Sequence, residues 1–434
     1  MIKTFNAHEG FSIYDIIKEL YPICRSITGP GIKETLRYFE KINKEFKRVK
    51  FKTGTKIFDW TVPSEWHIQD GYISHLSSGK KFANFKKNNL HIVNFSERVN
   101  KILPLDILKN KIHTNKKLSN AIPYVTSYYK KTWGFCMKEN EFKKLPKGNY
   151  KAVIKSKFKK GHLELSHALI KGSSKREIFF SSYVCHPSMA NNELSGPVVL
   201  NALLSYIKKN YKKTKFSYRF VLLPETIGSI AYLSKFGDEL KRNVFAGYVL
   251  SCLGDKGKFS LVKGPNQNCR SSKFLLNILK NKKFNLYNFL ERGSDERQYC
   301  SPGINLPVSL LCKSKFHYYK EYHSSLDNLN LINQKNLQQS LDVLIKLINF
   351  FEKNNFPENK IMCEAKLSKR GLYPALSKFD SHNPLSERLK LRTNFLAYAN
   401  GERTTAEISE LIKVKFKKVE AEQKTLLKNK LIRI

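Results

Sequence analysis

The sequence predicts an α/β protein with a mixed, largely parallel sheet flanked by helices. Two observations favour this class. From about residue 150 onward, short apolar runs of strand length alternate with segments whose apolar residues recur at helical spacing. Such alternation is typical of parallel strands joined by crossover helices. Polar residues also gather directly after the apolar runs, which is where open α/β sheets place their ligands.

The elements expected from these patterns follow the chain in order. Residues 12–24 and 32–46 are amphipathic and predict two helices around a turn. Strands are expected within 177–185, 217–224, 245–253 and 306–312. Helices are expected at 196–209, from about 228, at about 272–281 and over 336–353. No internal repeat interrupts this order.

Two further segments have a different character. Between about 50 and 150, short β-like runs are separated by turn residues, and all three tryptophans (Trp60, Trp66 and Trp133) lie there. This pattern predicts an inserted β-rich domain. From about residue 385, helical segments lead to a short basic tail. Thr404 or Thr405 is the expected N-cap of one of these helices, and the outline is that of a winged-helix domain.

The predicted domain boundaries follow from these changes. They are residues 1–48 for the N-terminal helices, 49–150 for the inserted β-rich domain, 151–360 for the α/β core, 361–384 for a linker and 385–434 for the winged-helix-like domain. A chain of 434 residues is long enough to give each domain a core of its own.

The charge of the chain is large, with 78 basic against 36 acidic residues and a formal net charge of +42. Only 15 of the basic residues are arginines, and the lysines are spread along the whole chain. Nucleic-acid surfaces favour arginine and gather their charge on one face. We therefore interpret the charge as a lysine-rich composition, and nucleic acid is not the favoured partner.

The cysteines and the apolar runs bear on the compartment. The eight cysteines form no CxxC pair, which argues against a zinc ribbon and a disulfide scaffold. No apolar run approaches the roughly 20 residues that a membrane-spanning helix needs. The sequence thus predicts a soluble cytoplasmic protein with no membrane partner, and it leaves a homo-oligomer open.

Candidate site residues follow three of the predicted strands. They are His186, Asn192 and Glu193 in the first loop, Glu225 after the second strand, and Asp295, Arg297 and Tyr299 in a later segment, with His323 further on. A single histidine after a strand is usually structural. Their recurrence at successive strand ends is more informative, because those ends meet at one edge of a parallel sheet. Two imidazoles with carboxylates fit a zinc site.

The order of these motifs resembles the zinc aminopeptidase fold group, which includes bacterial aminopeptidases, glutamate carboxypeptidase and glutaminyl cyclase. The sequence is most similar to a narrower aminopeptidase-like branch found in polysaccharide-biosynthesis loci, with an inserted β domain and a C-terminal winged helix. The motifs that carry the resemblance are "CHPS", "PETIGSI", "GSDERQY" and "EYHSSLD", together with "CRSITGPG" and "FDWTVPSEW".

The resemblance implies a zinc-peptidase-like fold and a role for each candidate. His186 and His323 would be zinc ligands, and Glu225 would be the general base. Asp295 would act beside the metal or bind a substrate amine. Glu193 is the further candidate ligand, and the candidate substrate-binding residues are Asn192, Arg297 and Tyr299.

Three positions depart from the two-zinc pattern of that group. Asn192 stands where a carboxylate bridges both metals, Thr226 replaces the second member of a Glu-Glu pair, and Ser251 or Cys252 replaces a later aspartate. A neutral side chain cannot offset two divalent charges. We therefore expect one zinc ion at most, completed by Glu193 or Asp295, or else a protein that has kept the fold and lost the metal.

Three functions remain open from the sequence. The first is a mononuclear zinc-dependent hydrolase that cleaves a peptide or amide bond in a small substrate. The second is a non-catalytic scaffold whose winged helix contacts protein or nucleic acid. The third is an amide hydrolase acting on a modified sugar, with aromatic residues of the insert (Trp60, Trp66, Trp133 and Tyr124) stacking on sugar rings; the core of a small β domain is the favoured explanation of those aromatic residues.

Overall fold

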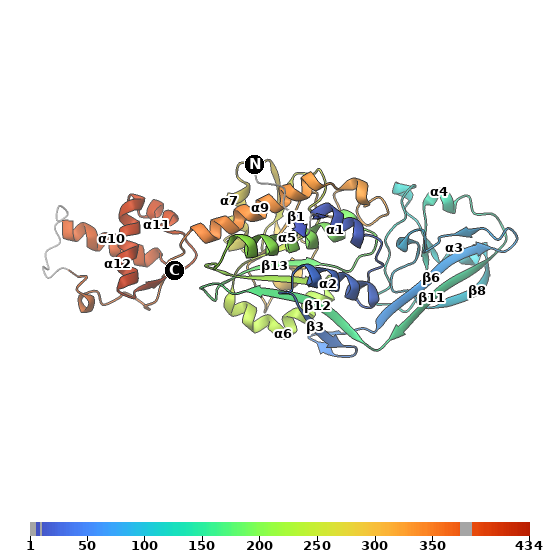
Figure 1. Ribbon diagram of the computed structural model, residues 1–434, viewed down its shortest axis with the longest axis horizontal. Helices are drawn as coiled ribbons and strands as arrows, with labels where there is room; N and C mark the ends of the chain where they lie inside the picture. The colour runs from blue at the N-terminus through green and yellow to red at the C-terminus, as the bar shows by residue number, and fades with distance from the viewer. Residues whose placement is uncertain (1–5, 9–10, 374–383) are drawn as a thin grey trace. The chain divides into compact units, whose positions relative to one another are not determined.

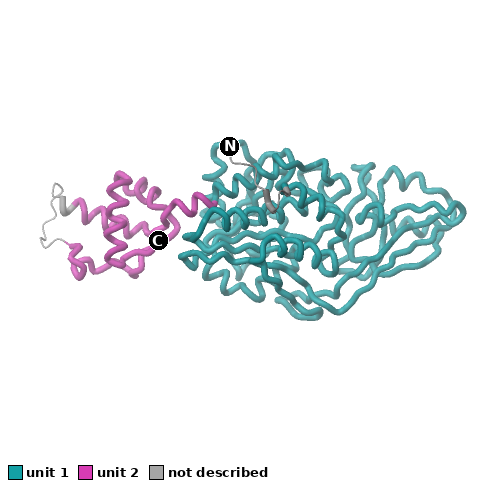
Figure 2. Tube along the Cα trace, in the orientation of Figure 1, with its two compact units in different colours: residues 1–347 teal, residues 348–434 magenta. Residues whose placement is uncertain are grey.

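The computed structural model describes residues 6–8, 11–373 and 384–434 of the chain. The chain divides into two compact units, residues 1–347 and 348–434, which Figure 2 shows in teal and magenta. Parts of the predicted N-terminal segment (1–5 and 9–10) and of the predicted linker (374–383) lie outside the described residues. The two units are described separately below.

The first unit is built on an eight-stranded sheet with the order β17-β16-β18-β15-β13-β14-β12-β3. The strands are β3 (Lys47–Lys52), β12 (His162–Ile170), β13 (Glu177–Tyr183), β14 (Ser217–Leu223), β15 (Val244–Leu250), β16 (Phe259–Val262), β17 (Phe284–Tyr287) and β18 (Val308–Cys312). The inner strands β18, β15, β13 and β14 run parallel, whereas β12 and β16 pair antiparallel with their inner neighbours. This mixed, largely parallel sheet confirms the predicted fold class.

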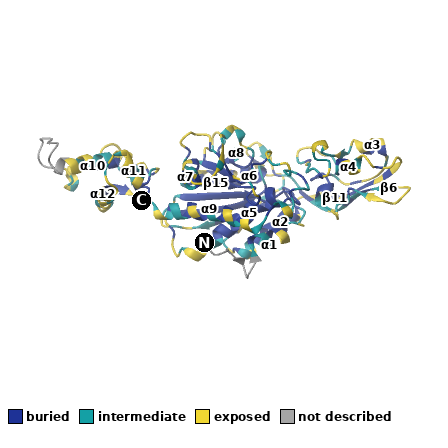
Figure 3. Ribbon diagram, turned by 90° about the horizontal axis from the view of Figure 1, so that it is seen from above, coloured by how far each residue is buried: buried dark blue, intermediate teal, exposed yellow. Residues whose placement is uncertain are grey.

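Helices cover both faces of the sheet. Figure 1 shows α5 and α6 on opposite sides of it. Every residue of β13, β14 and β15 is buried, which is why these strands are continuous apolar runs in the sequence, and Figure 3 shows them in dark blue. Among the described residues, no helix is long and apolar enough to cross a lipid bilayer.

The helices of this unit lie where the apolar periodicity places them. Their bounds are α1 (Ile13–Leu20), α2 (Pro30–Ile42), α3 (Leu105–Lys109), α4 (Glu139–Phe142), α5 (Ser195–Asn210), α6 (Ile227–Asn243), α7 (Arg270–Leu279), α8 (Glu296–Tyr299) and α9 (Gln334–Lys353), the last of which continues into the second unit. Helix α1 begins with a capping box, in which Ser12 and Asp15 each accept a backbone hydrogen bond from the other.

A second, four-stranded sheet has the order β7-β6-β11-β8. Its strands are β6 (Glu65–His75), β7 (Lys81–Phe82), β8 (Val99–Pro104) and β11 (Asn149–Lys159). Both sheets cross the predicted domain boundaries at 49 and 150. Strand β3, which spans the first boundary, belongs to the large sheet, and β11, which spans the second, belongs to the small sheet. A 3-10 turn, η1 (Asn89–His91), lies between β7 and β8.

Short pairs of strands complete the β structure. They are β1 (Asn6–His8) with β2 (Phe11–Ser12), β4 (Lys56–Ile57) with β5 (Trp60–Thr61), β9 (Ile112–His113) with β10 (Phe135–Cys136), and β19 (Glu358–Asn359) with β20 (Ile432–Arg433). The β4–β5 hairpin turns through only two residues, Phe58 and Asp59. This turn projects an aromatic side chain into solvent, since Phe58 is 63% exposed.

The second unit is the winged helix that the sequence predicts. It contains α10 (Pro384–Tyr398), α11 (Thr405–Leu411) and α12 (Phe416–Lys428), and β19 pairs antiparallel with β20. Thr404, one of the two expected N-caps, closes a capping box with Glu407 at the start of α11. The three helices share a core that includes Phe395, Ile408 and Leu426.

Gly196 sets how closely α5 approaches the sheet. A Cβ atom at this position would lie 2.4 Å from the carbonyl oxygen of Leu250 and 2.5 Å from Oγ of Ser182. We expect Gly196→Ala to lower the free energy of unfolding by about 1–3 kcal/mol, because the helix must move away from its sheet.

Gly237 in α6 provides the matched control. A Cβ atom there meets nothing within 4 Å. Gly237→Ala should therefore raise the free energy of unfolding by about 0.4–1 kcal/mol through the lower entropy of the unfolded chain. Urea unfolding of both variants measures the two effects, and equal stability of Gly196→Ala and the wild type would contradict the packing argument.

Candidate active site

The candidate site lies at the carboxyl ends of the parallel strands. The loops after β13, β14 and β15 meet there, together with the segment around His323. Each of these four segments contains a non-glycine residue with positive φ: Ser188 at 49°, Thr226 at 64°, Cys252 at 49° and His323 at 53°. Such conformations cost energy and cluster where a structure over-determines a functional geometry.

The loop after β13 contains a π-helical turn, η3 (Ala190–Leu194), which the sequence does not predict. Asp327 holds its first residues, because its carboxylate accepts the backbone N–H groups of Ala190, Asn191 and Asn192 at 3.0, 2.6 and 3.0 Å. Tyr319 donates a further hydrogen bond of 2.8 Å to the same carboxylate. Burial raises the pKa of Asp327 to about 6. Asp327 therefore fixes the turn that carries Asn192 and Glu193.

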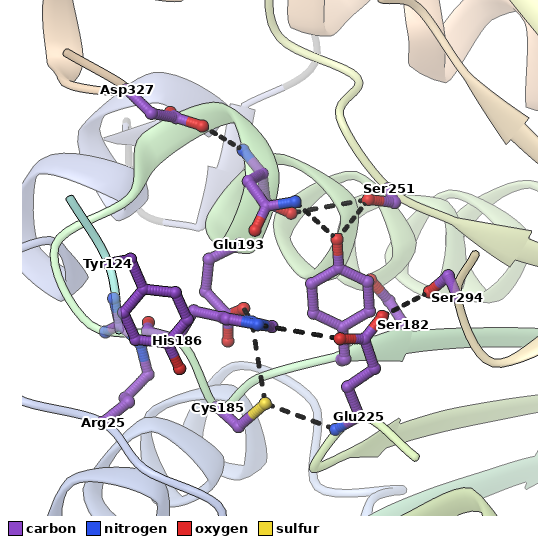
Figure 4. A network of polar contacts seen from close by, with 12 residues as sticks. Arg25, Tyr124, Ser182, Cys185, His186, Glu193, Glu225, Ser251, Ser294 and Asp327 are labelled. Carbon is purple, nitrogen blue, oxygen red and sulfur yellow. Dashed lines mark hydrogen bonds and ion pairs between the residues drawn. The ribbon is translucent and has the colours of Figure 1, made fainter. Parts of the chain in front are cut away.

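Glu193 points from this turn to His186. Its Oε2 lies 2.6 Å from Nδ1 of the imidazole, as Figure 4 shows, and both side chains are buried. Burial opposes the charge of His186, yet Cys185 and the carboxylate of Glu193 leave its pKa raised well above 6.5. Burial also raises the pKa of Glu193. The hydrogen bond fixes the ring and directs Nε2 away from Glu193.

Arg25 braces this pair from the loop between α1 and α2. It is fully buried, and its Nε donates to the carbonyl oxygen of His186 at 2.9 Å, while Nη1 donates to that of Leu20 at 2.7 Å. Its Nη2 and Oε1 of Glu193 are both buried without a hydrogen-bond partner among the described residues. Burial lowers the pKa of Arg25, and the charge of Glu193 acts in the opposite direction.

Glu225 faces the other nitrogen of His186. Its Oε2 lies 3.6 Å from Nε2, and its Oε1 accepts a hydrogen bond of 2.8 Å from Ser294. His323 completes the group, with its ring centre 5.3 Å from that of His186. Tyr124 packs edge-on against both imidazoles, at 5.1 and 5.2 Å. Burial, followed by the charge of His186, lowers the pKa of His323 well below 6.5.

A pocket of about 240 Å³ opens over these side chains. The residues that line it are Ile27, Tyr124, Thr126, Tyr128, Tyr129, Cys185, His186, Glu225, Thr226 and His323. Three of the predicted site residues, His186, Glu225 and His323, therefore share one cavity. Glu193 lies behind His186 and does not line the pocket.

Asp295 and Arg297 support the loop that carries Glu225. Oδ1 of Asp295 accepts the backbone N–H of Thr226 at 2.7 Å and the hydroxyl of Ser229 at 2.8 Å. Burial and the charge of Glu225 raise the pKa of Asp295 to about 7. Arg297 donates to the hydroxyl of Thr226 at 2.9 Å and to the carbonyl of Ser294, also at 2.9 Å. Both side chains therefore stabilise the strained conformation of Thr226.

Two predicted substrate-binding residues lie inside the protein. Tyr299 is fully buried, donates or accepts a 2.8 Å hydrogen bond with Ser181 and packs against Phe179 in the core under the sheet. Asn192 is also buried, and its amide donates to the hydroxyl of Tyr183 at 2.9 Å. Neither residue lines the pocket that His186, Glu225 and His323 share.

The donor set permits a geometric test for zinc. Zinc held tetrahedrally at about 2.0–2.2 Å by nitrogen and oxygen separates two ligand atoms by roughly 3.4 Å, and it holds two imidazole ring centres roughly 5 Å apart. The 5.3 Å between the ring centres of His186 and His323 fits two imidazole ligands of one ion, and the 3.6 Å between His186 and Glu225 would allow this carboxylate to be either a third ligand or a base beside the ion. The 2.6 Å between His186 and Glu193 is a hydrogen-bond length, too short for two ligands of one ion.

Two groups of described residues have donor atoms close enough to one another for a metal. The first is Cys185, His186 and Glu193, in which the imidazole is already hydrogen-bonded to the carboxylate, and the second is Glu65, His162 and Glu164. The carboxylates of the second group already have cationic partners. Lys33 lies 2.5 Å from Glu65, and Arg48 lies 2.5 Å from Glu164. This group is therefore an ion-pair network between α2 and the adjoining strands.

The fold and this strand-end site define the class of protein, which is that of the zinc aminopeptidase fold. A zinc aminopeptidase from Bacillus subtilis has the same fold with a TM-score of 0.58 at 14% identity, over 80% of this chain and 95% of that one. A putative peptidase from Clostridium acetobutylicum, known from a crystal structure, matches with a TM-score of 0.78 at 36% identity, over 97% of this chain and 95% of that one.

The chain belongs to the family described as Domain of unknown function (DUF4910), whose pattern matches residues 14–354. A winged helix-turn-helix pattern matches residues 355–434. A curated relative from Clostridium acetobutylicum is 41% identical over 372 residues, which cover 85% of this chain and 84% of that protein. Its name is "Putative polysaccharide biosynthesis protein with aminopeptidase-like domain". The predicted resemblance to the aminopeptidase-like branch is thereby confirmed.

Sequence reasoning missed two residues of this site, Arg25 and Ser294, and it placed Tyr124 only among the aromatic residues of the insert that could stack on sugar rings. Arg25 lies 161 positions before the histidine that it supports, so no local pattern connects the two. Its one signal is an arginine inside the apolar segment "YPICRSITG", where a buried cation needs a partner elsewhere. Tyr124 comes from the segment before β10, and its backbone N–H bonds to the carbonyl of His323 at 2.8 Å.

The proximity of Arg25 and Glu193 predicts an energetic coupling. Arg25→Met should lower the free energy of unfolding by about 3–5 kcal/mol, because it leaves the buried carbonyl oxygens of His186 and Leu20 without their donor and removes one of the two cations that act on the Glu193 carboxylate. In a Glu193→Gln background, the same substitution should cost less by at least about 1 kcal/mol. Urea unfolding at pH 7 of the wild type, both single variants and the double variant measures this difference. Additive effects within about 0.5 kcal/mol would show that the two side chains act independently.

Proposed function

We propose that the first unit is a hydrolase of peptide or amide bonds that uses one zinc ion, held by His186 and His323, with Glu225 as general base. The observation that carries this proposal is the arrangement around His186. One ring nitrogen is hydrogen-bonded to a buried carboxylate, and the other faces Glu225 at 3.6 Å in a pocket shared with His323. Zinc-binding histidines are typically oriented by a carboxylate in this way.

Each residue has a defined task in this proposal. Glu193 orients His186 and keeps Nε2 directed into the pocket, and Ser294 orients Glu225 through a 2.8 Å hydrogen bond. Glu225 accepts the proton of the attacking water and returns it to the leaving amine. A bound zinc ion would supply Lewis acidity toward the water and the scissile carbonyl. Asp295 and Arg297 hold Thr226 so that Glu225 stays at the mouth of the pocket.

One metal rather than two is supported by the neutral positions of the site. Asn192 donates to Tyr183, whose hydroxyl lies 2.5 Å from that of Ser251. The hydroxyl of Thr226 is taken by Arg297. A second ion would need negatively charged ligands at these positions. The side chains there are neutral instead, and they are hydrogen-bonded to other neutral groups or, for Thr226, to the cation of Arg297.

The name of the 41% identical relative supports a substrate class. That protein is named for polysaccharide biosynthesis with an aminopeptidase-like domain. A sugar that carries an amide would suit both parts of this name, since the sugar belongs to polysaccharide synthesis and the amide is the kind of bond that an aminopeptidase-like domain would cleave. We therefore propose an amide-bearing saccharide as the substrate of this hydrolase, with an ordinary peptide as the alternative to be compared in the assay below.

Metal analysis tests the zinc proposal directly. Protein purified without chelator and dialysed against zinc should hold about one ion per chain, and His186→Ala should hold almost none. Glu225→Gln should retain the zinc and lose at least about 100-fold in turnover, because the amide cannot accept the proton. The assay measures amine release from aminoacyl anilides and from N-acetylated saccharides.

The other outcomes separate the remaining readings. Loss of zinc in Glu225→Gln would make Glu225 a ligand instead of the base. A wild-type protein that binds no zinc would support a non-catalytic scaffold, whose fold is retained without the metal. Arg48→Lys, in the ion-pair network between α2 and the strands, is the control substitution outside the pocket and should leave the zinc content unchanged.

A further inference from the structure

A second pocket adjoins the candidate active site on the far side of the first turn of α6. It has a volume of about 460 Å³ and is enclosed by the β4–β5 hairpin, α6 and residues 298–304. Trp60 of the hairpin makes an edge contact of 5.5 Å with Tyr129, which lines the site pocket. Ile230 lines this second pocket and stands one helical turn after Thr226, which lines the first. We call it the hairpin pocket.

Aromatic side chains are displayed at the hairpin pocket instead of being packed away. Phe58 is 63% exposed and Tyr129 is 72% exposed, whereas Trp66 is only 3% exposed. Trp133 packs against the core of the four-stranded sheet. Of the three tryptophans, Trp60 is the one that lines the hairpin pocket, whereas Trp66 lines a separate pocket near Cys24 and Pro30. Some aromatic residues of the insert, such as Trp66 and Trp133, therefore pack in a core, and others, such as Phe58 and Tyr129, are exposed to solvent.

The backbone at Phe58 adds an independent observation. Phe58 is the first turn residue of a two-residue hairpin and has a φ of 53°, a conformation that favours glycine. A bulky residue in this conformation costs energy, and at 63% exposure Phe58 gains little of the burial that would offset the cost. A strained and exposed aromatic residue is accordingly better explained by a ligand than by stability.

The polar lining of the hairpin pocket indicates an uncharged ligand. Asp59 and Asp238 line it, and neither side chain has an ion pair or hydrogen bond with any other described residue. Lys235 and Lys241 line the same pocket, so its formal charges balance. Free carboxylates beside aromatic rings suit a ligand with an apolar face and a rim of hydroxyl groups, because each carboxylate accepts two hydrogen bonds.

We propose that the hairpin pocket binds a pyranose unit of the substrate, with the sugar ring stacked on Trp60 and Phe58 and its hydroxyls donating to Asp59 and Asp238. This subsite rests on the proposed function only in placing the amide of the same substrate in the neighbouring pocket. The chemistry of the lining favours a saccharide over an apolar peptide side chain, since the hydroxyl groups of a sugar can donate to the two exposed carboxylates and an apolar side chain cannot.

Binding measured without turnover tests the subsite. Saturation-transfer NMR and tryptophan fluorescence titration use N,N′-diacetylchitobiose and cellobiose as saccharide probes, and N-acetylphenylalanine amide and N-acetyllysine amide as peptide probes. The wild type should bind a saccharide probe, and Trp60→Ala should weaken that binding by about tenfold. Arg48→Lys, outside both pockets, should bind as the wild type does. Because no turnover is measured, a failure of the hydrolase proposal leaves this result intact.

Phe58→Gly separates a binding role from a structural one. Glycine relieves the strain at a positive φ, so the melting temperature should stay the same or rise while saccharide binding weakens. Tyr318→Ala, which removes another exposed aromatic residue of the same unit, should change neither property. Three outcomes overturn the proposal: no saccharide binding by the wild type, equal binding by Trp60→Ala, or binding of the peptide probes alone.

Discussion

The carboxylate of Asp327 is the interaction on which the candidate site depends. It gathers three consecutive backbone N–H groups and the hydroxyl of Tyr319, and so turns the loop after β13 into a π-helical turn. That turn is what points Glu193 at His186 and Asn192 at Tyr183. Without four acceptor interactions at one point, these buried N–H groups would be unsatisfied in a dry interior, and the loop would adopt another path.

The two sides of the site differ in charge, because the turn held by Asp327 directs Glu193 to one side and Asn192 to the other. On one side, the charged groups of Arg25, Glu193 and His186 are buried, and the partly exposed carboxylate of Glu225 faces His186 from the pocket. On the other, Asn192, Tyr183 and Ser251 share hydrogen bonds among neutral groups. Concentrating the carboxylates around His186 gives one cation a place to bind and removes the charge that a second would need. Asn192 therefore belongs to a hydrogen-bonded network through its amide nitrogen, and its Oδ1 has no hydrogen-bond partner among the residues that the structure describes.

The fold could be predicted because its signals are local. Three inner strands are buried along their whole length and therefore appear as continuous apolar runs, and α5 and α9 show helical periodicity. His186, Glu225 and His323 were accessible to the same reasoning, because strand ends converge. The role of Glu193 could not be predicted in this way. A carboxylate seven residues after His186 could either bind a metal beside the imidazole or accept a hydrogen bond from Nδ1, and the sequence does not distinguish the two. Arg25 was out of reach because its contact spans 161 residues.

Backbone strain connects the site to the hairpin pocket. Thr226 is β-branched and has a φ of 64°, yet it is held there by Asp295 from one side and Arg297 from the other. This conformation lets α6 begin immediately after Glu225, so that Glu225 faces one pocket and Ile230, one turn on, faces the next. A relaxed Thr226 would need a longer loop and would separate the two pockets. The strain at Thr226 therefore keeps residues that line the two pockets only four positions apart in the chain.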